Sequence, residues 1–411
     1  MLFYLGLLLT SIFLYYFPGY LCAIILSRDF QRGFDFLLRK HPILRWGLTL
    51  ILGLLGCLIV FIGAYVIYMQ THYYRIKDHQ TLTIKHKFSQ PKELKTGATY
   101  TASTYNVGFG AYNQDFSFFM DTGKMKDGTK TQGKYGKAES KAAVLQNTNG
   151  AIKTMEKVKT DFMLFQEIDT NSSRSYHVNQ VQKMSQQFSN YEEIFANNFH
   201  SPYLLYPLND PHGAVQSELL SLSKYSVDQA IRRKYPVTTS FITKFTDLDR
   251  CFTVMSTPVN NGHKLILINS HMSAYDKGGK MRVKQLKLLN SVMESEYKKG
   301  NYVIVGGDFN HTFGRKMLTH FKSQQKVPDW VSVLSDKELA PDMRMIHAEN
   351  ESTTPTCRGT DIPYQKGKTY TTVIDGFLVS KNVQATSENI NTEFAYADHN
   401  PVKLSFKLLN Q

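Results

Sequence analysis

Eight polar residues that can bind a cation or move protons stand at or beside the ends of apolar, strand-like runs. Ligand sites in α/β proteins gather at strand ends, so these side chains are expected to meet. Carboxylate and amide oxygens suit a hard divalent cation such as Mg²⁺, and histidines transfer protons near neutral pH. The set predicts a cation-assisted site built from Asn106, Glu167, His271, Asp308, Asn310, Asp375, Asp398 and His399.

The elements that must position these residues alternate between two periodicities. Apolar side chains at 142, 145, 152, 155 and 158 recur at helical spacing, and a second amphipathic helix is expected at about 280–300. Buried strands that alternate with such helices predict an α/β domain whose sheets are covered on both faces. The strands are predicted at 98–107, 161–167, 264–271, 302–308, 371–380 and 401–409.

The stretch "YVIVGGDFNHTF" joins a predicted core strand to two polar residues. Asp308 and Asn310 are two residues apart, so in extended chain their side chains share one face. Gly306 and Gly307 are expected to let the backbone pass close to a cation and a phosphate, where a Cβ would intrude. This motif predicts that the strand serves a ligand as well as the core.

The order of the motifs adds specificity. "VGGDFN", "IDGFLVS" and "ADHNPV" follow strands ending in Asn106, Glu167 and His271, and together they resemble the endonuclease/exonuclease/phosphatase superfamily, which includes pancreatic-type deoxyribonuclease. The chain resembles a membrane-anchored, bacterial-type member, and the match covers about residues 98–408. The resemblance implies a four-layer sandwich of two packed mixed β-sheets flanked by helices. It also implies hydrolysis of phosphate esters with Mg²⁺ or Mn²⁺.

The resemblance assigns the metal and one substrate contact to named positions. Glu167 is similar to the family's main metal ligand, with Asn106 beside it. Asp398 matches a carboxylate near the metal. Arg174, which follows soon after Glu167, is expected to contact the phosphate.

The same resemblance assigns the catalytic groups. Asp308 and Asn310 match the pair that orients or deprotonates the attacking water and holds the phosphate. His271 is similar to a histidine that donates to a phosphate oxygen or to the leaving group. His399 matches the histidine that exchanges a proton in the transition state, with Asp375 as its orienting partner. Gly376 departs from the family pattern and predicts a wider pocket.

Two uncharged runs, at about residues 2–27 and 46–71, each exceed the roughly 20 residues needed to cross a bilayer. We expect two transmembrane helices. A signal peptide for the first run lacks a basic start and a small-residue cleavage site, and a buried soluble hairpin is the other alternative. The basic loop between the runs predicts a multi-pass protein of the cell membrane whose catalytic domain is extracellular, although Arg75 and Lys77 oppose this orientation.

The predicted organisation is a membrane anchor (1–79), a tether (80–97) and an endonuclease/exonuclease/phosphatase-like catalytic domain (98–411). Residues 1–79 hold seven of the 48 basic and three of the 34 acidic residues, which leaves a net charge of +10 on residues 80–411. That excess suits nucleic acid or an anionic lipid surface, and it is also compatible with an ordinary solvated face.

Three functions remain open at this stage. A nuclease is preferred because of the positive charge and a lysine-rich loop after Asn106. A sphingomyelinase-like or phosphoinositide lipid phosphoesterase is the first alternative, and a non-catalytic surface binding module is the second. The two cysteines of the soluble part, Cys251 and Cys357, either form a disulfide or stay free thiols.

Overall fold

The computed structural model describes residues 41–410, apart from 239–242, 246–247 and 275–279. The first predicted membrane span, residues 2–27, lies outside the described residues. The second coincides with helix α4 (Pro42–Thr71). Its segment Trp46–Thr71 is, among the described residues, the one helix whose length and composition would allow it to cross a membrane. A separate compact unit begins at His72.

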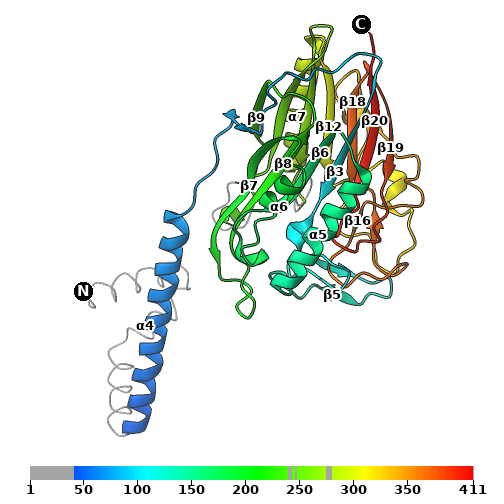
Figure 1. Ribbon diagram of the computed structural model, residues 1–411. Coiled ribbons are helices and arrows are strands. Elements are labelled where there is room, and N and C mark those ends of the chain that lie inside the picture. Colours follow the sequence, from blue (N-terminus) through cyan, green and yellow to red (C-terminus); the bar gives the residue numbers. More distant parts are fainter. Residues whose placement is uncertain (1–40, 239–242, 246–247, 275–279, 411) are drawn as a thin grey trace. The chain divides into compact units, whose positions relative to one another are not determined.

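Two seven-stranded sheets build this second unit (Figure 1). The first contains one parallel pair, β11 with β12, and antiparallel neighbours, so it is mixed. Its strands in spatial order are β1 (Gln80–Thr81), β9 (Gln229–Lys234), β10 (Cys251–Pro258), β11 (Lys264–His271), β12 (Tyr302–Asp308), β18 (Asp375–Ser380) and β15 (Met343–Ile346).

The second sheet is also mixed, because β3 and β6 are parallel while the other pairs are antiparallel. Its strands in spatial order are β19 (Val383–Asn389), β20 (Val402–Leu408), β3 (Thr99–Asn106), β6 (Phe162–Asp169), β8 (Gly213–Ser223), β7 (Glu192–Leu204) and β2 (Ile84–Lys85). Three short ribbons pair outside the sheets: β4 (Thr122–Lys124) with β5 (Lys130–Gln132), β13 (His311–Phe313) with β14 (Ser332–Leu334), and β16 (Cys357–Arg358) with β17 (Thr371–Thr372).

Three apolar layers hold the sheets and helices together. The central layer fills the space between the sheets, where Leu164 of one sheet meets Ile304 and Phe377 of the other. An outer layer joins the first sheet to helix α7 (Lys280–Lys298). Another joins the second sheet to α5 (Lys141–Val158) and α6 (Gln180–Gln187), which lie in front of it in Figure 1. Two mixed sheets with flanking helices confirm the predicted α/β sandwich.

The predicted tether is corrected by the structure. Short strands β1 and β2, at 80–81 and 84–85, pair with β9 and β7 at the edges of the two sheets. Leu94 is fully buried in the central layer. Residues 80–97 are therefore part of the folded unit. Strands of two residues are too short to show an alternation of apolar and polar side chains. The sequence of residues 80–97 therefore resembles a polar linker.

Gly306 and Gly307 allow close packing within the sheet and against the central layer. The sequence predicted instead that they would make room for a cation and a phosphate. A Cβ on Gly307 would collide with the carbonyl oxygen of Ser270 on the neighbouring strand β11. A Cβ on Gly306 would press on the ring of Phe377 in the central layer. Gly376 likewise makes room for the ring of Phe313, so its small size does not widen a pocket.

Replacing Gly307 with alanine is expected to destabilise the folded unit by about 3 kcal/mol, because backbone of β11 must move to admit the methyl group. Gly128→Ala is the matched control, since Gly128 has open space around its Cβ position and carries only the strain of a positive φ. Thermal unfolding of the full chain in detergent compares the two. Equal melting temperatures for both variants would contradict the collision.

Candidate active site

Three of the predicted catalytic residues form one row across the first sheet. The strand register pairs His271 of β11 with Asp308 of β12, and Asp308 with Asp375 of β18. Residues paired in this way point to the same face, so their side chains are neighbours. The row lies where β11 and β12 end and β18 begins, as expected for a ligand site in an α/β fold.

The second sheet contributes Asn106 and Glu167 to the same place. The Asn106 amide donates to Asp308 Oδ2 at 3.0 Å and approaches Glu167 Oε1 at 3.4 Å. Glu167 Oε1 lies 3.7 Å from His271 Nε2. These contacts join the two sheets through polar groups at one edge of the sandwich, while apolar side chains fill the rest of the interface.

Glu167 is held in an unusual backbone conformation. Its φ is +51°, and the pairing of β6 with β8 shifts register between Phe165 and Ile168. A bulge of this kind re-aims one side chain out of the strand's alternation, and strained residues of this kind gather at functional sites. The side chain is 22% exposed, more than the other carboxylates of the group, so it is the one most open to a ligand.

His399 forms a buried ion pair with Asp375. Its Nδ1 donates to Asp375 Oδ2 at 2.8 Å, and its Nε2 lies 3.9 Å from both Asp308 Oδ2 and Asp398 Oδ2. Burial alone would lower the pKa of His399, but the negative charge of Asp375, together with that of Asp398 and Asp308, raises it well above its usual value. The ring is therefore a cation at neutral pH.

His271 has the opposite charge state. Burial and the nearby Arg250 guanidinium lower its pKa well below the usual value, so the ring is neutral. The Asn198 amide nitrogen lies 3.0 Å from Nδ1, and its oxygen accepts from the Cys251 amide, which makes Nδ1 the acceptor. The Arg250 guanidinium, which can only donate, contacts Nε2, so each nitrogen of the neutral ring faces a donor.

Two carboxylates of the site have raised pKa values. Burial raises the pKa of Asp308 to about 6, with Asp375 adding to the effect and His399 opposing it. Burial raises the pKa of Asp398 to about 7, with Glu167 adding to the effect while His399 and Arg358 oppose it. The imidazolium therefore compensates only part of the negative charge.

Two acceptor atoms confirm this imbalance. Asp398 Oδ1 and Asp375 Oδ1 are buried and accept no hydrogen bond from the residues that the structure describes. A buried oxygen without a donor is costly, so a bound cation or donor is expected to complete the site. Asp308, Asp375 and His399 also offer ligand atoms that all lie within 4.8 Å of one another.

Asn310 fixes the conformation of the chain around Asp308 through its own hydrogen bonds. Its φ is +50°, its backbone amide donates to Asp308 Oδ1 at 2.8 Å, and its side-chain amide donates to the Met272 carbonyl. Asp308 Oδ1 is thus fixed by the chain, and Oδ2 is the oxygen that faces the histidines.

The structure gives Arg174 a different role from the predicted substrate contact. Its guanidinium makes two bonds of 2.9 and 3.1 Å to Asp169, is buried, and lies 3.8 Å above the ring of Phe109. The arginine that reaches His271 is Arg250, just before β10. Neither Arg250 nor Asn198 belongs to a recognisable motif, so only their spatial position identifies them.

Cys251 and Cys357, the two cysteines of the soluble part, are both free and buried. Cys357 pairs by a β-bridge with His399, and burial raises the pKa of its thiol to about 12. A thiol that stays protonated is a poor nucleophile.

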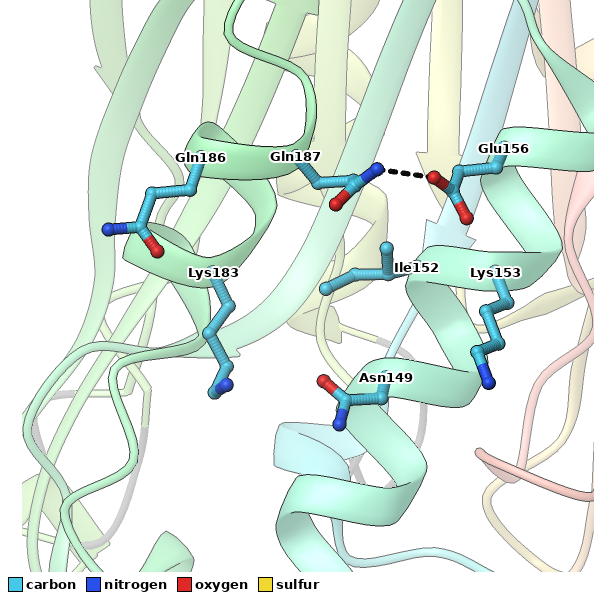
Figure 2. A pocket seen from close by; sticks show the side chains of 7 residues that line it. All are labelled: Asn149, Ile152, Lys153, Glu156, Lys183, Gln186 and Gln187. Atoms are coloured by element: carbon cyan, nitrogen blue, oxygen red, sulfur yellow. Dashed lines mark hydrogen bonds between the residues drawn. The ribbon is translucent and has the colours of Figure 1, made fainter.

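A separate groove of about 360 Å³ lies between α5 and α6 and holds none of the predicted site residues (Figure 2). Lysine, glutamine, asparagine and glutamate side chains line it around Ile152. Gln187 of α6 bonds Glu156 of α5 across the groove. It is a gap between two helices, and the chemistry lies at the strand ends.

No family model and no curated protein sequence matches this chain. The chain is similar to solved proteins of the endonuclease/exonuclease/phosphatase fold. TDP2 from Caenorhabditis elegans is 13% identical, with 78% of each chain covered and a TM-score of 0.47. An endonuclease/exonuclease/phosphatase from Beutenbergia cavernae is 10% identical over 76% of this chain and 72% of that chain, with a TM-score of 0.47.

A third similar structure is ANGEL2, a 2',3'-cyclic phosphatase, which is 11% identical over 81% of this chain and 99% of that chain, with a TM-score of 0.48. Identities this low do not carry the role of any residue from one chain to another. The chemistry of this site is therefore argued from its own side chains.

Asp375→Asn is expected to lower the pKa of His399, because the carboxylate that favours the imidazolium is replaced by a neutral amide. The measurement is an NMR titration of the full chain with ¹³C-labelled histidine. Glu351→Gln, which removes the partner of the distant His347, is the control and should leave the pKa of His399 unchanged. An unchanged midpoint for His399 in Asp375→Asn would show that the pair does not set its charge.

Proposed function

We propose that the chain is a divalent-cation-dependent phosphoesterase that hydrolyses its substrate by direct attack of water. One observation carries the proposal: two buried histidines of one site face opposite charges, His399 the carboxylate of Asp375 and His271 the guanidinium of Arg250. The cationic His399 can give a proton to a leaving group, and the neutral His271 can donate a hydrogen bond to a phosphate oxygen. Phosphoryl transfer needs this combination of positioning and charge neutralisation.

Glu167, Asn106 and Asp398 are the residues proposed to hold the cation. Their oxygens suit Mg²⁺ or Mn²⁺, and Asp398 Oδ1 is a buried acceptor that lacks a donor. The triplet of Asp308, Asp375 and His399 fits less well, because Nδ1 of His399 is already bonded to Asp375. When bound, the cation stabilises negative charge on the phosphate oxygens.

The remaining residues act on protons and position the ester. Asp308, with a pKa of about 6, takes a proton from water as the water oxygen attacks phosphorus. The bond from phosphorus to the ester oxygen breaks, and His399 Nε2 protonates that oxygen. His271 Nε2–H and the Arg250 guanidinium donate to the non-bridging oxygens.

A covalent intermediate is disfavoured by the surroundings of His399. Cys357 is the thiol beside it, and burial keeps that thiol protonated with a pKa of about 12. Water activated by Asp308 is therefore the proposed nucleophile.

Two substrates have specific support. Exposed lysines on the β4–β5 ribbon after Asn106 favour nucleic acid, as the charge of the sequence predicts. Exposed Tyr206 and Leu208 between β7 and β8 favour a phospholipid headgroup, because a phosphate backbone offers nothing to a leucine. We propose the phospholipid ester as the substrate and nucleic acid as the second candidate.

The full chain in detergent, assayed with sphingomyelin, phosphoinositides, plasmid DNA and RNA, is expected to hydrolyse one class in Mg²⁺ and none in EDTA. Asp308→Ala and His399→Ala should each lower kcat by about 10²–10⁴, the usual contribution of a general base or acid. His347→Ala is the control, because this half-exposed histidine lies outside the site. Turnover that is indifferent to EDTA or to both site variants would refute the mechanism.

We further propose that α4 anchors the chain in the cell membrane with residues 72–411 on the outer side. The helix is long and apolar enough, and the charge distribution predicts this orientation.

Protease added to intact cells should then remove the soluble unit, detected by an antibody to the C-terminus. A C-terminal epitope that stays protected in intact cells and is lost only after permeabilisation would reverse the orientation.

A further inference from the structure

Four exposed apolar or aromatic side chains lie at the end of strand β7, in the loop that follows it, and in the loop before β4. Tyr203 is the last residue but one of strand β7, and Tyr206 and Leu208 follow the strand, with Leu208 82% and Tyr206 66% exposed. Met120 comes from the loop before β4, and the ring of its neighbour Phe119 packs on Tyr206 with centroids 5.5 Å apart. We refer to Met120, Tyr203, Tyr206 and Leu208 as the apolar tip.

Positive charge gathers in the β4–β5 ribbon, which begins two residues after Met120. Lys124 and Lys130 are both exposed and are paired directly across the two strands. Like charges opposite each other on a ribbon are destabilising, so an anionic partner would relieve this pair. Lys134, also exposed, lies just beyond β5.

The apolar tip belongs to the same end of the second sheet as the candidate active site. Strand β8 begins at Gly213, directly after the tip, and its Ser217 pairs with Asp169, two residues beyond Glu167. The loop that carries Met120 begins soon after Asn106, and Asp210 holds its far end through the Gly136 amide at 2.8 Å. A surface that bound the tip would therefore lie on the catalytic side of the unit.

The strand that leads to the tip also contacts the first residues of the second unit. His200 lies on β7, three residues before Tyr203, and its ring packs on Tyr74 with centroids 4.3 Å apart. Only His72 and Tyr73 separate Tyr74 from Thr71, the last residue of α4. Arg75 is then tied to Asp249 by a 3.0 Å ion pair. These contacts hold the first residues of the second unit against the strand that leads to the tip.

We propose that the apolar tip and the lysines of the β4–β5 ribbon dock on the surface of an anionic phospholipid bilayer. Tyrosine is enriched at membrane interfaces, leucine and methionine gain from contact with acyl chains, and lysines pair with anionic headgroups. Nucleic acid would satisfy the lysines and stack on tyrosine, but it gives Leu208 and Met120 no partner. This binding goes beyond the proposed catalysis and does not depend on it.

The test uses the full chain reconstituted in vesicles of phosphatidylcholine and phosphatidylglycerol. The environment-sensitive fluorophore nitrobenzoxadiazole is attached at Leu208→Cys, in a chain whose Cys22 and Cys57 are replaced by serine. Cys251 and Cys357 are buried and stay unlabelled. The matched control carries the label at Val283→Cys, because Val283 is an exposed apolar residue of α7, outside the tip.

The label at 208 is expected to be quenched by nitroxide-labelled lipids and protected from aqueous iodide, whereas the label at 283 should show the reverse. In the double variant Lys124→Glu/Lys130→Glu, the label at 208 should become accessible to iodide. Equal iodide quenching at 208 and 283 would overturn the proposal. So would a label at 208 that responds to a single-stranded DNA oligonucleotide and not to the vesicles. Protection at 208 that survives the charge reversal would overturn the preference for anionic lipid.

The vesicles need no hydrolysable substrate, and the label reports binding alone. Turnover that is unchanged in Asp308→Ala, with the label at 208 still buried, would refute the proposed function and keep the docking surface. Turnover that is lost in Asp308→Ala, with the label at 208 accessible to iodide, would refute the docking surface and keep the catalysis.

Discussion

The burial of charge at one edge of the sandwich is the constraint on which the site depends. The ion pair between Asp375 and His399 lies among further carboxylates, where water cannot screen it, and a buried pair is favourable only if its remaining polar atoms are satisfied. Hydrogen bonds from the surrounding protein satisfy some of these polar atoms. Thr356 Oγ1 accepts from the Asp375 amide, and Asn106 of the other sheet donates to Asp308. Asp375 Oδ1 and Asp398 Oδ1 accept no hydrogen bond from the described residues, and the proposed function assigns a bound cation to this place.

Separate elements hold two chemically identical side chains in opposite electrostatic surroundings. Asp375 makes His399 a cation, whereas Arg250 and burial make His271 neutral. The cause is local composition, one carboxylate or one guanidinium within contact distance, and the sheets only supply the spacing. Such a division of roles between two groups of one type is a common way to run acid and base chemistry at one pH.

Much of the sandwich and most of the site follow from the sequence because period and strand ends are local properties. The runs ending in Asn106, His271 and Asp308 are strands that end where predicted, and the row across β11, β12 and β18 follows from their alternation. Arg174 and the segment 80–97 show where local reading fails. A buried arginine with an aspartate partner looks the same in sequence as one that faces substrate, and edge strands of two residues carry no period. Arg250 and Asn198 depend on contacts between distant strands, which no single stretch encodes.

The row of His271, Asp308 and Asp375 has a consequence for how such a chain can diverge. Loops between these strands can lengthen or shorten while the row stays intact, because the pairing register is unchanged. Deleting one residue inside β12 would turn Asp308 to the opposite face of the sheet and bring an apolar neighbour into its place. Insertions and deletions are therefore tolerated in the loops of related chains. Within these three strands they would destroy the row.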